Sequence, residues 1–112
     1  MLKKENRLAK KKDFDAVWQK GRSSFDKILG VKILPNKIAI NRFGIMVGLK
    51  VSKKAVERNK IKRRIREIIK AQAENLKIGF DVVIAALPMV QSKKFAELKK
   101  SILLNFKRLR IL

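Results

Sequence analysis

The segment of residues 53–76 constrains the fold of this chain more than any other. It contains no glycine or proline, and Ser52 just before it is a residue type that caps helices. Drawn at about 100° per residue, the segment places four isoleucines on one arc: Ile61, Ile65, Ile68 and Ile69. We therefore predict a long helix that buries this arc in a core.

Two further elements are expected after the long helix. Residues 80–87 are almost wholly apolar and end at Pro88, which is typical of a central strand buried on both faces. Ser92 can then cap a final helix, whose apolar residues recur at helical spacing: Phe95, Leu98, Ile102, Phe106 and Leu109. The centre of the chain is therefore predicted to be a strand–long helix–strand unit.

A short helix is predicted near the N-terminus, over residues 13–20. Asp13 is a suitable cap, and Phe14, Val17 and Trp18 fall on one helical face. Two strands are then expected before the long helix.

The first of these strands is predicted over residues 25–34 and the second over residues 43–50. A short apolar piece, residues 38–40, extends or precedes the second strand. Gly44 and Gly48 either weaken that strand or mark a close approach by another backbone. The order α-β-β-α-β-α predicts an α+β two-layer sandwich, a small mixed sheet packed with three helices. No linker or repeat divides the chain, so we expect one domain, residues 1–112.

Charge narrows the range of functions. The chain has 30 Lys and Arg against 9 Asp and Glu, a net charge of +21, yet 46% of its residues are hydrophobic. It can therefore build a core and is not a disordered basic tail. A charge of this size repels itself, and a polyanion relieves that repulsion, so the domain is expected to bind nucleic acid.

Several other classes are excluded by residue types that the chain lacks. Without cysteine there is no disulfide framework, and without histidine the usual metal ligand and general base are missing. The carboxylates are scattered, so we expect no catalytic and no metal-binding residue in the protein itself. The longest uncharged run, residues 82–92, is too short to span a bilayer and contains a proline, and no signal peptide begins the chain. We expect a soluble, cytoplasmic protein that does not bind membranes.

The long helix carries a basic arc beside its isoleucines. The arc consists of Asn59, Arg63, Arg66 and Lys70, with Lys62 at its border. Arg58 falls on the isoleucine arc itself, where it is expected to point past the end of the sheet toward an anion. Glu67 is placed to pair with Arg63 and Lys70. A merely solvated helix face is the alternative interpretation.

The two aromatic residues of the first helix allow two interpretations. Phe14 and Trp18 lie at i and i+4, where the bases of a single strand can stack on them. Ordinary packing against the sheet explains the same spacing equally well.

Other nucleic-acid binders remain as alternatives at this point. A small structural ribosomal protein shares the charge and size, although the Gly- and Lys-rich tail that would favour it is absent. A DNA-compacting protein would need a dimer interface or a minor-groove arm, and neither is recognisable. A self-sufficient nuclease lacks its general base and metal ligands.

The basic helix contains the motif of a known family. Residues 57–67 read ERNKIKRRIRE and closely resemble the signature of the protein component of bacterial ribonuclease P, R-N-[R/K]-x-K-R-x-x-R-[E/Q]. Residues 6–21, 42–47 and 80–85 resemble the flanking parts of that family in the same order. The chain departs from the family pattern at Gly48-Leu49-Lys50 and at Ala86-Leu87.

The resemblance implies a fold, a partner and an activity. The fold is that of a domain of ribosomal protein S5, in which the strand–helix–strand crossover is left-handed, against the general rule. The partner is the catalytic RNA of ribonuclease P, in a complex with one copy of the protein. Together they remove the 5′ leader of precursor tRNA by hydrolysis. The RNA carries the chemistry with Mg²⁺, and the protein binds no cofactor of its own.

The resemblance and the basic arc also assign site residues. The residues expected at the catalytic RNA are Arg58, Asn59, Lys60, Lys62, Arg63, Arg66 and Lys70, preceded by Lys50, Lys53 and Lys54. The residues expected at the single-stranded leader are Phe14, Trp18, Lys10 and Lys11.

Overall fold

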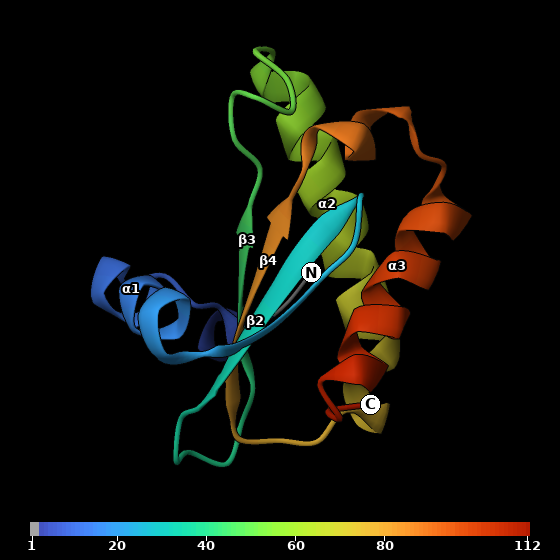
Figure 1. The fold of residues 1–112 in the computed structure, drawn as a ribbon. Coiled ribbons are helices and arrows are strands. Elements are labelled where there is room, and N and C mark those ends of the chain that lie inside the picture. The colour runs from blue at the N-terminus through green and yellow to red at the C-terminus, as the bar shows by residue number, and fades with distance from the viewer. Residues whose placement is uncertain (1–2) are drawn as a thin grey trace.

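The computed structural model describes residues 3–112 and contains a four-stranded mixed sheet with three α-helices (Figure 1). The helices are α1 (Lys11–Lys20), α2 (Ala55–Gln72) and α3 (Phe95–Arg108), and the strands are β1 (Arg22–Phe25), β2 (Leu29–Pro35), β3 (Arg42–Met46) and β4 (Phe80–Ala86). Three 3-10 helices complete the chain: η1 (Lys4–Asn6), η2 (Ala73–Asn75) and η3 (Pro88–Ser92). The predicted α+β class and the small mixed sheet with three helices are confirmed.

The strands are arranged in the order β1-β2-β4-β3. β2 runs antiparallel to both β1 and β4, whereas β3 runs parallel to β4. The parallel pair is joined by α2, which forms the crossover of the predicted strand–helix–strand unit. β4 is therefore an interior strand, as its apolar sequence predicts.

Helices cover both faces of the sheet. α2 and α3 lie on one face, and α1 packs against β2 and β4 on the other (Figure 1). Alternate residues of each strand consequently enter different clusters. In β4, Val82 and Ile84 join the main core under α2 and α3, whereas Val83 packs with Val17 of α1 in a smaller cluster.

The isoleucine arc of α2 is buried as predicted, because Ile61, Ile65, Ile68 and Ile69 all belong to the main core. The apolar stripe of α3 is confirmed from Leu98 to Leu109. Its first member, Phe95, is 41% exposed, because α3 begins at this residue and its first turn extends beyond the core.

The strand predicted over residues 25–34 is confirmed as β2 from Leu29 onward, but its predicted start is wrong, because residue 25 ends a separate strand, β1, and a turn lies between the two. β1 and β2 pair as a hairpin, and Asp26 builds the turn. Its Oδ1 accepts hydrogen bonds from the backbone N–H groups of Ile28 (2.8 Å) and Leu29 (2.9 Å), as an Asx turn does.

Asp26 also ties the hairpin to α3. Its Oδ2 accepts hydrogen bonds from Ser101 Oγ and from Asn105 Nδ2 (3.2 Å). Burial raises the pKa of Asp26, but the hydrogen bonds from Ser101, Leu29, Ile28 and Asn105 outweigh burial and lower the pKa below its ordinary value.

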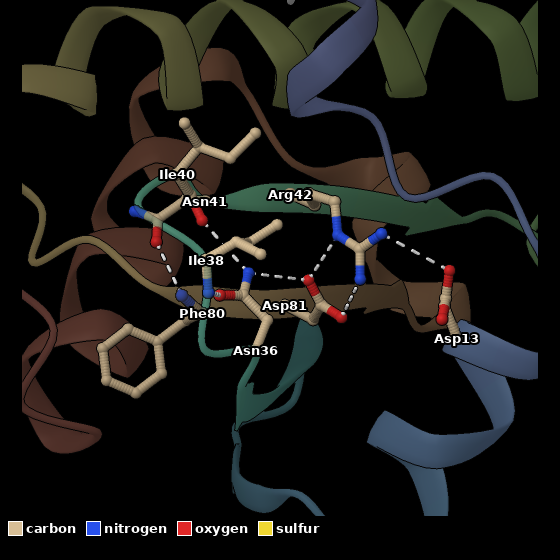
Figure 2. Close-up of polar contacts among 8 residues, drawn as sticks. All are labelled: Asp13, Asn36, Ile38, Ile40, Asn41, Arg42, Phe80 and Asp81. Atoms are coloured by element: carbon tan, nitrogen blue, oxygen red, sulfur yellow. Dashed lines mark hydrogen bonds and ion pairs between the residues drawn. The ribbon is translucent and has the colours of Figure 1, made fainter.

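The predicted short strand at residues 38–40 is also wrong, and the second strand is shorter than predicted, ending at Met46. Residues 37–40 form bends shaped by Asn36, whose Oδ1 accepts from Ile38 N and whose Nδ2 donates to Ile40 O, each at 3.0 Å (Figure 2). These side-chain bonds compete with strand pairing.

None of the three predicted helix caps acts as one. α2 begins after Lys54, and Ser52 instead donates a hydrogen bond to Glu57 and accepts one from Lys54 N. Ser92 donates to the carbonyl of Met89 within η3. Asp13 lies inside the first turn of α1, which begins two residues earlier than predicted.

Arg42 of β3 connects three elements through its guanidinium group (Figure 2). Its Nε and Nη2 donate to Oδ1 and Oδ2 of Asp81 in β4, at 2.8 and 2.7 Å. Its Nη1 lies 3.5 Å from Oδ2 of Asp13 in α1. Asp81 is buried and also accepts a bond from Asn36 Nδ2. The hydrogen bond with Asp81 raises the pKa of Arg42, so its guanidinium group stays charged.

We predict that Arg42→Ala will destabilise the fold by about 3 kcal/mol, because it leaves the buried carboxylate of Asp81 without its cation. Asp13→Asn removes only the longer, partly exposed contact and is expected to cost less than about 1 kcal/mol. Urea unfolding of the two variants and the unchanged chain measures both values. Equal losses for the two variants would contradict a dominant role for the Arg42–Asp81 pair.

Candidate nucleic-acid interface

A hollow of about 480 Å³ lies beside α1, on the face of the sheet opposite α2. It is lined by Ala9, Lys11, Phe14, Asp15, Trp18 and Met46. The hollow is mainly apolar, with one lysine at its wall. Both aromatic residues singled out in the sequence therefore line the same hollow.

Phe14 and Trp18 differ in how far they are buried. Phe14 is half-buried, and its ring lies so close to Gly44 of β3 that a Cβ there would overlap it. The close approach expected at Gly44 is thus made by a side chain. Trp18 is 42% exposed, whereas Val17 between them is fully buried. Packing against the sheet therefore accounts for Phe14 in part and leaves much of the Trp18 ring accessible.

Lys32 of β2 contacts Trp18 in two ways. Its Nζ lies 4.2 Å from the centroid of the indole ring, a cation–π geometry. The same ammonium donates a 2.7 Å hydrogen bond to the Trp18 carbonyl oxygen at the end of α1. Lys32 therefore fixes the ring and places a positive charge beside it.

Lys10 and Lys11 stand at the start of α1, and both are exposed. Lys11 lines the hollow directly, and Lys10 is the residue from which α1 begins. Lys11 therefore adds a positive charge to the apolar surface of the hollow, which the carboxylate of Asp15 also lines.

The basic arc of α2 is open to solvent along most of its length. Asn59, Arg63 and Lys70 are exposed, and Lys62 and Arg66 are half-buried. Lys60 is exposed as well, although it falls outside the arc.

Carboxylates do not neutralise this helix. Within residues 3–112, the ion pairs are Arg42 with Asp13, Arg42 with Asp81, and Lys93 with Glu97. The expected pairing of Glu67 with Arg63 and Lys70 is therefore wrong. Glu67 lies four residues after Arg63 and three residues before Lys70, near enough for attraction. An ion pair between exposed side chains adds little stability, however, because ordering the two side chains costs entropy.

Arg58 does not point past the sheet toward solvent, as expected. Its Nη1 donates a 2.9 Å hydrogen bond to the carbonyl oxygen of Ser52, and the side chain is half-buried. This hydrogen bond offsets part of the desolvation cost of placing an arginine on the isoleucine arc. Arg58 therefore fixes the loop that precedes α2.

That loop carries the other three predicted lysines. Lys50, Lys53 and Lys54 are exposed and line a hollow of about 430 Å³ with Glu57 and Gln91. Glu57 accepts hydrogen bonds from Ser52 Oγ (2.5 Å) and Gln91 Nε2 (2.7 Å), so the loop is held against η3. The N-terminal end of α2 adds its partial positive charge to that of the lysines.

The predicted site residues thus form two surfaces. The leader residues gather on the α1 face, and the basic residues of α2 and its loop lie in the layer on the other face (Figure 1). Within residues 3–112, no three acidic side chains come together where a metal ion could be held. In the same part of the chain, no helix has both the length and the apolarity to cross a membrane.

Sequence reasoning missed three residues that shape the α1 face: Lys32, Arg42 and Met46. Arg42 and Met46 share a face of β3 with Gly44, so the two-residue period of a strand could have grouped them. Lys32 had no comparable signal, because its contact with Trp18 depends on how α1 lies across β2.

Comparison with known proteins places the chain in a family. A family model described as Ribonuclease P matches residues 2–110. The ribonuclease P protein component of Clostridium acetobutylicum is 39% identical over 101 residues, which cover 88% of this chain and 84% of that protein. The counterpart from Synechocystis is 44% identical over 88 residues, covering 78% of this chain and 71% of that protein.

Solved structures agree with this placement. The ribonuclease P protein of Staphylococcus aureus superimposes with a TM-score of 0.88 at 30% identity, covering 95% of this chain and 96% of that one. The protein from Thermotoga maritima gives a TM-score of 0.83 at 29% identity, covering 91% and 96%. From its sequence and its fold alike, the chain belongs to the ribonuclease P protein component family, a family of endonuclease subunits that work with ribonuclease P RNA.

Proposed function

We propose that this protein binds the catalytic RNA of ribonuclease P through α2 and holds the 5′ leader of precursor tRNA in the hollow beside α1. The RNA then cleaves the leader to leave the mature 5′ end of the tRNA. One protein associates with one RNA, and the bond is hydrolysed with Mg²⁺ held by RNA phosphates. The protein contributes binding and positioning.

The uncompensated charge of α2 supports contact with the catalytic RNA. Asn59, Arg63 and Lys70 are exposed along one side of the helix, and no carboxylate pairs with its cations within residues 3–112. Such cations release condensed counterions when they meet phosphates, which favours binding. Lys50, Lys53 and Lys54 extend the positive surface to the loop before α2.

The hollow beside α1 supports contact with a single strand. Phe14 and Trp18 supply flat apolar surfaces, and Lys11 and Lys32 place positive charge next to them. Aromatic rings with neighbouring cations are the usual platform for unpaired bases and their phosphates. A duplex could not bring its bases to such rings.

The observation that carries the proposal is the separation of these two surfaces by one rigid sheet. A protein that bound only a structural RNA would need the basic helix and would have no use for an exposed tryptophan beside a hollow on the opposite face. A protein with both can bring an RNA catalyst and a single-stranded substrate segment into a fixed relation.

Cleavage of precursor tRNA by a bacterial ribonuclease P RNA at low Mg²⁺, with and without this protein, tests the proposal. We expect the protein to restore accurate 5′ processing, because its cations reduce repulsion between the two RNAs. No stimulation, even with the cognate RNA, would reject the proposed function. Cleavage by the protein alone would reject the assignment of the chemistry to the RNA.

We predict that Arg63→Ala will weaken binding to ribonuclease P RNA by about threefold to tenfold and lower the salt slope by about one. Lys107→Ala on α3 is the matched control, since it removes the same charge from another exposed position. Filter binding over a range of salt concentrations measures both quantities. If the two variants behaved alike, net charge would explain binding and the α2 surface would not.

We predict that Trp18→Ala will weaken binding of precursor tRNA to the assembled enzyme by about fivefold or more, because stacking is worth about 1–3 kcal/mol per base. Binding of mature tRNA should not change. Phe95→Ala is the control, because Phe95 is exposed to the same extent on α3. Equal losses for both tRNAs, together with lower stability, would show that Trp18 serves packing alone.

A further inference from the structure

A third hollow, of about 420 Å³, adjoins the end of the α2 surface, where the N-terminal segment meets the end of α2. It is lined by Lys3, Asn6, Ala39, Ile40, Asn41, Phe43, Lys70, Ala73 and Ile78. These residues come from η1, the loop between β2 and β3, the start of β3, and the end of α2 with the segment that follows it. None of the functions proposed above uses this hollow except through Lys70.

The walls of the hollow are mainly apolar and open to solvent. Phe43 is buried at its base, whereas Ile78 is 65% exposed, and Ala39 and Ala73 are exposed beside it. Ile38, in the same loop as Ala39, is a further exposed apolar residue. Exposed apolar surface gathered around a hollow is typical of a binding site.

Two lysines line the hollow. Lys70 is the last member of the basic arc of α2, so the positive row on that helix ends here. Lys3 comes from the N-terminal segment, which runs beside β3 through a bridge between Arg7 and Phe43. An apolar wall with two cations is complementary to a nucleotide, which combines a flat base with anionic phosphates.

Two asparagines supply the polar groups of the hollow. Asn41 is engaged within the protein: its Nδ2 donates to Lys77 O (2.8 Å), and its Oδ1 accepts from Phe80 N (2.9 Å) (Figure 2). Asn6 donates through Nδ2 to the Asn41 carbonyl oxygen (2.8 Å), which fixes its amide orientation, because a carbonyl can only accept. The Oδ1 of Asn6 is thereby left as an acceptor, to which an N–H group of a nucleobase could donate.

We propose that this hollow binds one unpaired nucleotide, with its base against the apolar wall and its phosphates held by Lys3 and Lys70. The inference rests on the proposed function in one respect: the nucleotide belongs to the RNA partner. The site adds a base contact to a surface that otherwise contacts the backbone. Its occupant is an unstacked nucleotide, so the RNA must present a bulge, a loop or an end here.

Methyl NMR titrations of the full chain with AMP, ribose 5-phosphate and inorganic phosphate test the site itself. We expect AMP to shift the methyl signals of Ala39, Ile40 and Ile78 saturably, because its base packs against the apolar wall. Ribose 5-phosphate, which lacks the base, and inorganic phosphate should leave these methyls unmoved. Equal shifts from AMP and ribose 5-phosphate, or shifts confined to the hollow beside α1, would overturn the proposal.

A pair of matched substitutions tests the hollow in the ribonucleoprotein. Ala73→Phe fills it, whereas Ala71→Phe adds the same ring at an exposed α2 position that does not line it. We expect Ala73→Phe to weaken binding of AMP and of ribonuclease P RNA by about tenfold, a change of about 1.4 kcal/mol, and Ala71→Phe to change neither. A two-dimensional amide spectrum of each variant checks that the fold is kept.

The outcomes separate this inference from the proposed function. If the unchanged chain binds the RNA and both variants bind it equally well, the hollow is not a nucleotide site in the complex and the inference is overturned. If the unchanged chain fails to bind the RNA while AMP still fills the hollow and ribose 5-phosphate does not, the nucleotide site stands and the proposed function fails.

Discussion

The pair formed by Arg42 and Asp81 is the interaction on which the arrangement of this molecule depends. β4 is covered by helices on both faces, so a carboxylate in it must be paired. Arg42, in the neighbouring parallel strand, pairs with Asp81 through Nε and Nη2 and contacts Asp13 through Nη1. One guanidinium group therefore joins the two strands of the crossover and contacts the helix that carries Phe14 and Trp18.

The sheet separates two kinds of surface. One side presents aromatic rings with a few cations, and the other presents a helix whose cations have no acidic partners within residues 3–112. Phosphate contacts fix position, and stacking selects unpaired bases. A small domain can divide these two tasks because its four strands hold α1 and α2 at a constant separation.

Features that follow from the spacing of residues along the chain could be predicted from the sequence. Features that depend on contacts between distant segments could not. The buried isoleucines of α2 and the interior position of β4 follow from spacing and from an apolar run. The β1–β2 hairpin was missed because Asp26, an ordinary surface residue type, builds its turn through contacts with α3. The cation of Lys32 over Trp18 likewise arises from residues far apart in sequence. For the site, the sequence predicted the candidate residues and two separate surfaces for them, and the structure added that the sheet lies between α1 and α2.

Gly44 has a consequence for how this family can vary. The Phe14 ring occupies the space where a side chain at position 44 would stand, so the two positions share one volume. A chain that acquired alanine at position 44 would have to accept a smaller residue at position 14 or a displaced first helix. We therefore expect the residues at these two positions, one in a helix and the other in a strand, to covary within the family.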